Sequence, residues 1–184
     1  MHKFSPSGAE RLERPERYAL IQPEETLRRF GLGPGMHFLD VGAGTGFFSR
    51  AASTLVGPSG HVYAAEMSDE MLKSLKHYGT PLNMTLVRNR EYEIPVAAAT
   101  ADFALLAFVL HENVDRPRLL DEVLRVVKRG GRLVIIEWKK QQEEAGPPME
   151  ERLGEEELDR LLGAFRVGEK GDLNLSHYYR VVIR

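Results

Sequence analysis

The feature that most constrains this chain is a glycine-rich turn between an apolar run and a helical pattern. Residues 37–41 form a short, largely apolar run, and Asp40-Val41-Gly42-Ala43-Gly44-Thr45-Gly46 carries it into a turn. From residue 47 to 55, apolar side chains recur at helical spacing. A buried strand, a glycine turn and a helix in this order predict a ligand at the carboxyl end of the strand, because glycine lets the backbone approach it closely.

The remainder of the chain repeats this alternation of strands and helices. We expect further strands at 61–65, 83–87, 102–108 and 133–136, and two closing strands near Phe165 and at 178–183. Helices are expected around 9–14, from Pro23, from Ser68, from Asp115 to the pair Gly130-Gly131, and over 155–162. The pattern predicts an α/β fold: a mostly parallel sheet covered by helices on both faces, with an antiparallel edge.

Length and composition fit one domain over residues 1–184, with residues 139–153 as a charged surface loop. The net charge of −2 provides no basic field for nucleic acid, so a nucleic-acid partner is not expected. Cysteine is absent, and the longest apolar run, residues 103–110, is too short to cross a bilayer. We therefore expect a cytoplasmic protein without membrane contact. The sequence carries no signal for an oligomeric state and no histidine clustering typical of a metal site.

The spacing of the turn distinguishes between nucleotide-like ligands. The glycines follow G-x-G-x-G, and Phe47 stands where a dinucleotide-binding motif needs its last glycine. The carboxylate of Asp40 beside the turn would repel a pyrophosphate but suits a cationic ligand. S-adenosylmethionine (SAM), with its amino-acid end and its sulfonium, fits these residues better than a dinucleotide does.

Glu66 and Met67 end the second expected strand. Glu66 lies about 20 residues beyond the turn, where an acidic residue accepts hydrogen bonds from ribose hydroxyls. Met67 beside it can pack against an adenine face. The alternative is a surface carboxylate next to a core methionine, and the distance from the glycine turn favours the ligand-binding interpretation.

Four motifs in order resemble the class I SAM-dependent methyltransferases. Residues 38–47 look like their first motif, Glu66 matches their ribose-binding acid, residues 101–103 resemble their fourth-strand motif, and residues 124–133 resemble the turn before their fifth strand. Residues 2–17 also look like a small prokaryotic branch with ubiquinone/menaquinone-methyltransferase-like sequences. The resemblance implies a Rossmann-like, doubly wound, seven-stranded sheet of order 3-2-1-4-5-7-6.

The resemblance also implies roles for individual residues. Asp40 and the turn backbone would hold the methionine end of SAM, Glu66 the ribose, and Met67 the adenine. Asn89, Arg90 and Glu91 occupy the adenine-amine region, where many relatives have Gly-Asp, so which of the three contacts adenine stays open. Two residues at the end of the fourth strand would line the methionine side. The full set of expected SAM contacts is Asp40, Gly42, Ala43, Gly44, Thr45, Gly46, Glu66, Met67, Asn89, Arg90, Glu91, Ala107 and Phe108.

Two further hypotheses concern catalysis. His111 follows the fourth strand and is a candidate to accept a proton from an acceptor; the alternative is that it only shapes the pocket wall. Residues 3–22, including Phe4, Arg17 and Tyr18, are expected to fold over the cofactor as a lid.

The reaction expected is an in-line displacement, in which a nucleophile attacks the methyl carbon and the thioether departs. The fourth strand is not followed by the Asn/Asp-Pro-Pro-Tyr of relatives that methylate nucleic-acid bases, so a small-molecule acceptor is expected. Two alternatives stay open: a non-catalytic SAM-binding module or partner subunit, and a dinucleotide-dependent oxidoreductase, which Phe47 disfavours.

Overall fold

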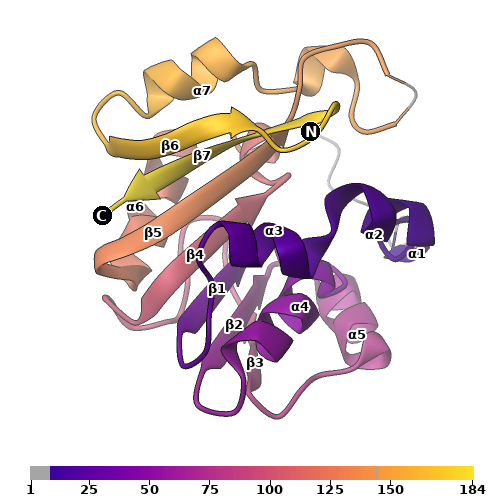
Figure 1. Ribbon diagram of the computed structural model, residues 1–184, viewed down its shortest axis with the longest axis vertical. Helices are drawn as coiled ribbons and strands as arrows, with labels where there is room; N and C mark the ends of the chain where they lie inside the picture. The colour runs from indigo at the N-terminus through magenta and orange to yellow at the C-terminus, as the bar shows by residue number, and fades with distance from the viewer. Residues whose placement is uncertain (1–8, 144) are drawn as a thin grey trace.

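The computed structural model describes residues 9–143 and 145–184 and contains a seven-stranded sheet flanked by helices (Figure 1). The strand order is β3-β2-β1-β4-β5-β7-β6, which confirms the expected fold. Strands β1 to β5 pair in parallel, whereas β7 runs antiparallel to both β5 and β6. The strands are β1 (His37–Val41), β2 (His61–Glu66), β3 (Met84–Arg88), β4 (Ala101–Ala107), β5 (Val127–Trp138), β6 (Arg166–Asp172) and β7 (His177–Ile183).

Helices cover both faces of the sheet. They are α1 (Ala9–Leu12), α2 (Pro15–Ile21), α3 (Pro23–Arg29), α4 (Phe47–Val56), α5 (Asp69–Tyr78), α6 (Arg116–Val126) and α7 (Glu155–Leu161), with 3-10 turns η2 (Leu110–Glu112) and η3 (Met149–Glu151). In the central strand β4, Phe103 and Leu105 pack towards α3 and α4, whereas Ala104 and Leu106 pack towards α6 and α7. Because both faces of β4 are buried after Asp102, its sequence from Phe103 to Ala107 is continuously apolar rather than alternating.

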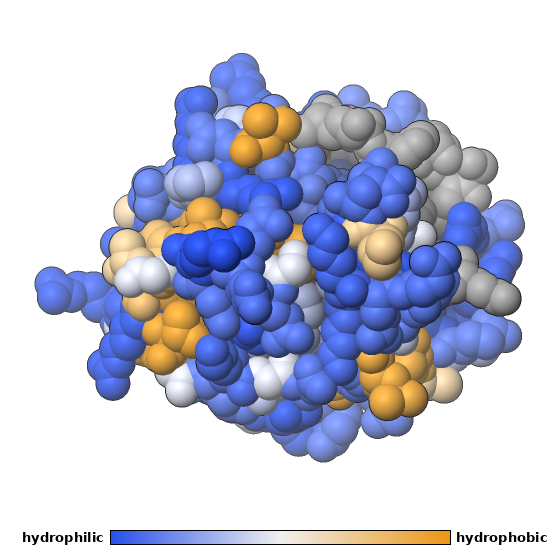
Figure 2. Space-filling view, turned by 90° about the horizontal axis from the view of Figure 1, so that it is seen from above, coloured by the Kyte–Doolittle hydropathy of each residue, from blue (hydrophilic) through white to orange (hydrophobic). Residues whose placement is uncertain are grey.

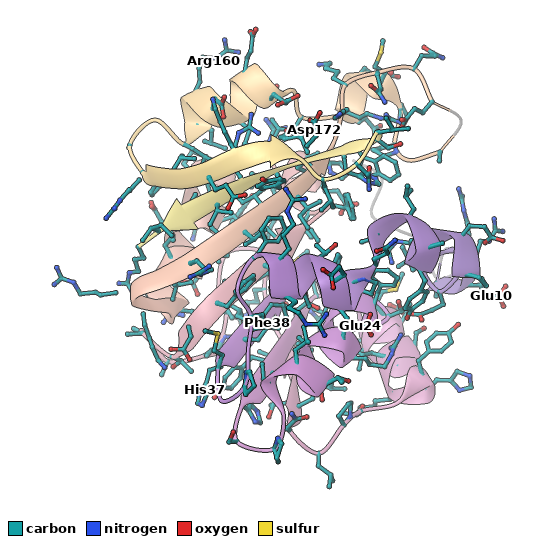
Figure 3. All side chains as sticks on the ribbon, in the orientation of Figure 1. Glu10, Glu24, His37, Phe38, Arg160 and Asp172 are labelled. Carbon is teal, nitrogen blue, oxygen red and sulfur yellow. The ribbon has the colours of Figure 1, made fainter. Side chains whose placement is uncertain are left out.

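The surface of the molecule is mainly hydrophilic. Figure 2, a view from above, shows charged and polar residues with separate apolar patches between them. Figure 3 contrasts Phe38, which lies inside the fold, with Glu10 at the outer edge of α1. Over the part of the chain that the structure describes, the helices are all too short or too polar to cross a bilayer.

The N-terminal segment contains one more helix than expected. Besides α1, the chain forms α2, which begins at Pro15, because proline suits the first turn of a helix. Arg50 on α4 fastens this segment: its guanidinium donates to Glu13 at 2.6 Å and to the Tyr18 hydroxyl at 3.2 Å. The ring of Tyr18 packs on Phe47 at 4.4 Å between centroids. The segment is therefore fixed to the first turn of α4. Phe4 lies outside the described residues.

The prediction that Gly130-Gly131 ends a helix was wrong. Helix α6 ends at Val126, and both glycines lie inside β5. The backbone N–H of Gly130 donates to Arg184 at 2.7 Å, and a Cβ at Gly131 would lie 2.8 Å from the Val127 side chain. The glycines thus allow a closely packed bend within the strand. From sequence, a glycine pair after an amphipathic helix resembles a helix C-terminus, and only the strand pairing distinguishes the two.

The charged segment 139–153 is organised around one buried side chain. Arg152 is 3% exposed, and the hydrogen-bond acceptors around its guanidinium belong to the same segment. Its guanidinium donates to the carboxylate of Glu143. It also donates to four backbone carbonyls, those of Lys139, Gln141, Ala145 and Pro147. The loop therefore surrounds the guanidinium of Arg152. Its composition alone does not predict this arrangement.

Candidate functional site

The glycine turn leads from the end of β1 into α4. The N–H groups of Gly42 and Ala43 donate to the carbonyl of Ala65 at 2.8 and 3.0 Å, which ties the turn to the end of β2. Gly42 has φ +73°, and a Cβ there would lie 2.4 Å from the Val109 side chain. Gly44 has φ +56°, and a Cβ there would lie 3.5 Å from the Leu12 side chain of α1, an ordinary contact, so this glycine faces α1 without being tightly packed.

Two acidic residues stand beside the turn. Glu66, at the end of β2, accepts hydrogen bonds from the backbone N–H of Gly44 at 2.9 Å and of Ser68 at 2.8 Å. Asp40 is almost fully buried and accepts a 2.5 Å hydrogen bond from Ser49 on α4. Burial raises the pKa of Asp40 to about 6, because a desolvated carboxylate loses hydration. A cationic ligand would restore its ionised form, so this pair of acids suits a ligand with a positive charge and hydroxyl groups.

The adenine candidates occupy different environments. Asn89 is buried, and its backbone N–H donates to the backbone carbonyl of Glu66 at 3.3 Å. Its side-chain nitrogen donates to the Arg90 carbonyl, but its Oδ1 has no hydrogen-bond partner among the described residues. Arg90 is exposed and paired with Glu93 at 3.0 Å, while Glu91 is half-buried. Of the three, Asn89 alone presents a buried, partnerless acceptor.

The other expected contacts of the turn are also placed. Ala43 and Thr45 are buried, and the Thr45 hydroxyl likewise lacks a partner among the described residues. Met67 is half-buried directly after Glu66. These side chains and the side-chain oxygen Oδ1 of Asn89 lie at the carboxyl ends of three adjacent parallel strands, β1, β2 and β3, where this class of sheet binds its ligands.

Phe108 bounds the opposite side of this edge. It follows Ala107 at the end of β4 and has φ +63°, a left-handed conformation that a phenylalanine adopts only under structural constraint. Its N–H donates to the Ile136 carbonyl at 2.8 Å, and its ring centroid lies 5.5 Å from that of Trp138. The pairing with β5 therefore holds the strained backbone in place.

His111 on η2 is held by an acid that the sequence analysis missed. Its Nδ1 lies 2.8 Å from one oxygen of Glu137, and its backbone N–H donates to the other at 3.1 Å. Glu137 ends the apolar run of β5 and is fully buried. Burial by itself lowers the pKa of His111, but the hydrogen bond and charge of Glu137 raise it overall. The sequence signal that could have predicted the role of Glu137 is a carboxylate at the end of the apolar run of β5.

Glu112 completes this titratable group. Its Oε1 lies 4.0 Å from the Nε2 of His111, and burial raises its pKa to about 7. Among the described residues, no three histidine or acidic side chains are arranged to hold a metal ion. His111, hydrogen-bonded to Glu137 and close to Glu112, belongs to a group of side chains suited to proton transfer.

Arg17 on α2 connects the two sides. Its guanidinium carbon lies 4.0 Å from the Phe47 ring centroid and 5.9 Å from that of Phe108. Burial lowers the pKa of Arg17 to about 10. Two surface hollows, of about 420 and 490 Å³, lie elsewhere, beside α7 and beside β6 and β7. Helix α2 therefore places the Arg17 guanidinium against rings from both sides of this site.

Comparison with known proteins places the chain in a family. Residues 39–135, more than half of the chain, match the family model described as a methyltransferase domain. The ubiquinone/menaquinone biosynthesis C-methyltransferase UbiE of Pasteurella multocida is 35% identical over 114 residues, 60% of this chain and 42% of that protein. The protein of the same name from Ectopseudomonas mendocina is 34% identical over 119 residues, 62% of this chain and 46% of the relative. The matches thus span less than half the length of these relatives.

A solved structure extends the likeness to the whole chain. The crystal structure of a SAM-dependent methyltransferase from Aquifex aeolicus is 35% identical, with a TM-score of 0.92 over 98% of this chain and 99% of that chain. A dinucleotide-dependent oxidoreductase is therefore no longer a competing interpretation. The chain belongs to the class I SAM-dependent methyltransferases, enzymes whose cosubstrate is S-adenosylmethionine.

Proposed function

We propose that this chain transfers the methyl group of SAM to a small-molecule acceptor by in-line displacement. The observation that carries the proposal is the meeting, at one edge of the sheet, of the bare turn at Gly44, the amide-held carboxylate of Glu66 and the partnerless Oδ1 of Asn89. Bound there, SAM supplies a methyl group that its sulfonium makes electrophilic.

Each of these groups has a role in holding SAM. The turn from Gly42 to Gly46 and the Asp40 carboxylate take the methionine end. Glu66 accepts hydrogen bonds from the ribose, because a carboxylate has lone pairs left after its two amide contacts. The Asn89 oxygen accepts from the adenine amine, with Met67 against the ring. Ala107 and Phe108 border the methionine side, and Arg90 and Glu91 play a lesser part.

His111 accepts the proton that an acceptor hydroxyl, amine or acidic carbon loses. Glu137 binds the Nδ1 side of the ring, which leaves Nε2 as the free nitrogen facing Glu112. A histidine oriented in this way by a carboxylate is a positioned general base. This arrangement favours an enzyme over the alternative of a non-catalytic SAM-binding subunit, which needs no buried histidine–carboxylate pair.

The N-terminal segment acts as a lid through Arg17 and Tyr18. Its two helices are fixed to α4 by Arg50, and Arg17 reaches from α2 across Phe47 towards Phe108. Closure of such a segment excludes water and orients the reactants, effects worth on the order of 7–11 kcal/mol in well-positioned systems. Replacing Arg17 with Met is expected to weaken both SAM binding and turnover, and unchanged values for both would remove the lid from the mechanism.

The acceptor class is narrowed by the relatives. The UbiE proteins are named as C-methyltransferases of ubiquinone and menaquinone biosynthesis. Their similarity makes methylation at carbon of a small ring compound the first reaction to test, with N- and O-methylation as alternatives. Nucleic acid is not proposed as an acceptor, since the net charge is −2.

The proposal is tested by the small molecules that the protein retains and by methyl transfer. Mass spectrometry of the purified protein is expected to show SAM or its demethylated thioether product. Incubation with SAM carrying a tritiated methyl group and a metabolite extract is expected to give a labelled small molecule. A protein that retains SAM but labels nothing in the extract would support the non-catalytic alternative.

A further inference from the structure

The imidazole ring of His177 is fully buried and has no hydrogen-bond partner among the described residues. It is the first residue of β7, where it pairs in register with Trp138 of β5, and it is 0% exposed. Neither its Nδ1 nor its Nε2 has a partner among the described residues. Burial lowers the pKa of His177 to about 4, so the ring is neutral and carries one donor and one acceptor.

The surroundings of His177 are aromatic. Its ring centroid lies 4.3 Å from Trp138, at an interplanar angle of 67°, and 4.8 Å from Phe108. An N–H aimed at the indole face would be a weak substitute for one hydrogen bond, and it would leave the other nitrogen unsatisfied. Because an unsatisfied buried polar group is destabilising, two on one ring indicate that a ligand completes them.

The position of His177 identifies that ligand. Phe108 ends β4, Trp138 ends β5, and His177 begins the antiparallel β7, so the three rings meet at the edge of the sheet that carries the SAM contacts. Arg17 of the lid lies over Phe108.

Two backbone features fix this group of rings. Phe108 keeps its left-handed φ of +63°, and Gly146 lies so close to Trp138 that a Cβ would come within 2.9 Å of the indole. Such conformations persist where the surrounding structure over-determines them, which is common at ligand sites.

We propose that Phe108, Trp138 and His177 form the acceptor subsite, and that it takes a planar aromatic acceptor carrying a hydroxyl group. The aromatic rings contact the acceptor ring, and the neutral imidazole of His177 makes the hydrogen bond to its hydroxyl. This inference rests on the proposed methyl transfer. Since Glu137 and Trp138 are consecutive at the end of β5, their side chains leave opposite faces, so the His111–Glu137 pair and the rings flank the carboxyl end of this strand from its two sides.

The chain contains a single tryptophan, Trp138, so its fluorescence reports directly on this subsite. Protein saturated with S-adenosylhomocysteine is titrated with p-cresol, with toluene, which lacks the hydroxyl, and with 4-methylcyclohexanol, which lacks the aromatic ring. We expect p-cresol to bind at least about 10-fold more tightly than either analogue. Toluene cannot make the hydrogen bond, and 4-methylcyclohexanol cannot make the aromatic ring contact. Equal affinities for the three compounds would overturn the proposal.

The variant His177→Phe keeps a ring but removes both nitrogens. We expect the preference for p-cresol over toluene to fall to less than about 2-fold and the Tm to rise by a few degrees, because the unsatisfied groups are gone. His177→Leu, close in volume to histidine, repeats the test in case phenylalanine overfills the site. His61→Phe is the matched control, since His61 begins β2, bonds to Thr85 and lies at the opposite edge of the sheet.

The outcomes separate this proposal from the proposed function. If the histidine is only structural, both His177 variants lower the Tm and keep the preference for p-cresol, which overturns the subsite. Calorimetric titration with S-adenosylhomocysteine is run on each protein. Failure of the wild-type protein to bind it would contradict the proposed function, whereas normal binding with no response of Trp138 to p-cresol contradicts only the subsite.

Discussion

The two halves of the candidate site are built in different ways. On the SAM side, the proposed contacts come from the turn after β1 and from the ends of β2 and β3, and the Glu66 carboxylate is held by backbone N–H groups. On the proposed acceptor side, Phe108, Trp138 and His177 meet through their rings, and His111 pairs with Glu137 on the opposite face of β5. Backbone recognition suits a cosubstrate common to a family, whereas side chains can vary with the acceptor.

The largest expected loss of SAM affinity that would test this comparison is caused by a substitution at Gly44. Gly44 has φ +56°, and Gly44→Ala adds a methyl group 3.5 Å from the Leu12 side chain, within the turn where we propose that SAM binds. We expect SAM affinity to fall about 100-fold, or about 2.7 kcal/mol, in calorimetric titration. Gly57→Ala is the control, because Gly57 has φ +65° and no atom within 4 Å of its Cβ position. Equal losses in both variants would show that backbone strain, and not ligand contact, causes the effect.

The next effect concerns the ribose. Glu66→Ala removes an acceptor that two backbone N–H groups hold in place. Hydrogen bonds to charged groups contribute about 1.5–3 kcal/mol, so we expect SAM affinity to fall roughly 10- to 100-fold. The exposed neighbour Glu70 serves as the matched position, and Glu70→Ala should leave the Kd unchanged. A Glu66→Ala protein that binds SAM normally would exclude this carboxylate from the site.

The pH dependence of SAM binding sharpens the comparison further. Asp40 has its pKa raised to about 6, and a cationic ligand binds its ionised form. Affinity is therefore complete above about pH 6 and is lost as the pH falls below it, by up to about 10-fold per pH unit. We expect Asp40→Asn to bind more weakly at pH 8 and to show a flatter profile. Since Glu112 has its pKa raised to about 7, the same titrations with Glu112→Gln separate the two groups.

The smallest expected effect lies on the acceptor side and leaves SAM affinity unchanged. Glu137→Gln removes the charge that raises the pKa of His111 but keeps the burial that lowers it. Proton NMR of His111 should therefore find its pKa above the ordinary histidine value of about 6.5 in the wild type and below it in the variant. Glu137→Ala would test whether the carboxylate also supports the η2 turn.

The same pair predicts a pH-dependent stability difference. Because the pKa of His111 is raised by folding, its pairing with Glu137 stabilises the protein fully below the unfolded pKa and loses this contribution as the pH rises through the folded value. The difference in Tm between wild type and Glu137→Gln should therefore be larger in mildly acidic than in mildly alkaline buffer. A constant difference would mean that the histidine does not titrate with its partner.

The helices and strands show where local pattern suffices. The turn after β1, the cap of α5 by Ser68 and the apolar run from Phe103 to Ala107 in β4 were predictable, because each depends on neighbours in the chain. Gly130-Gly131 misled the prediction, since a glycine pair permits both a helix end and a strand bend, and the pairing with Arg184 decides between them. The loop around Arg152 was likewise hidden, because a buried cation with carbonyl partners resembles surface charge in sequence.

The sequence by itself determined the alternating fold, the family and the expected SAM contacts, because backbone geometry, glycine spacing and nearby acids are local properties. Only the tertiary structure distinguished Asn89 from Arg90, paired His111 with Glu137 and enclosed His177 between Phe108 and Trp138. The His111–Glu137 pair and the contacts of His177 depend on the register of β4, β5 and β7, which lie far apart in the chain, whereas Asn89 follows β3, which pairs with β2. Strand register decides which side chains share a face, and pairing partners distant in sequence fix that register.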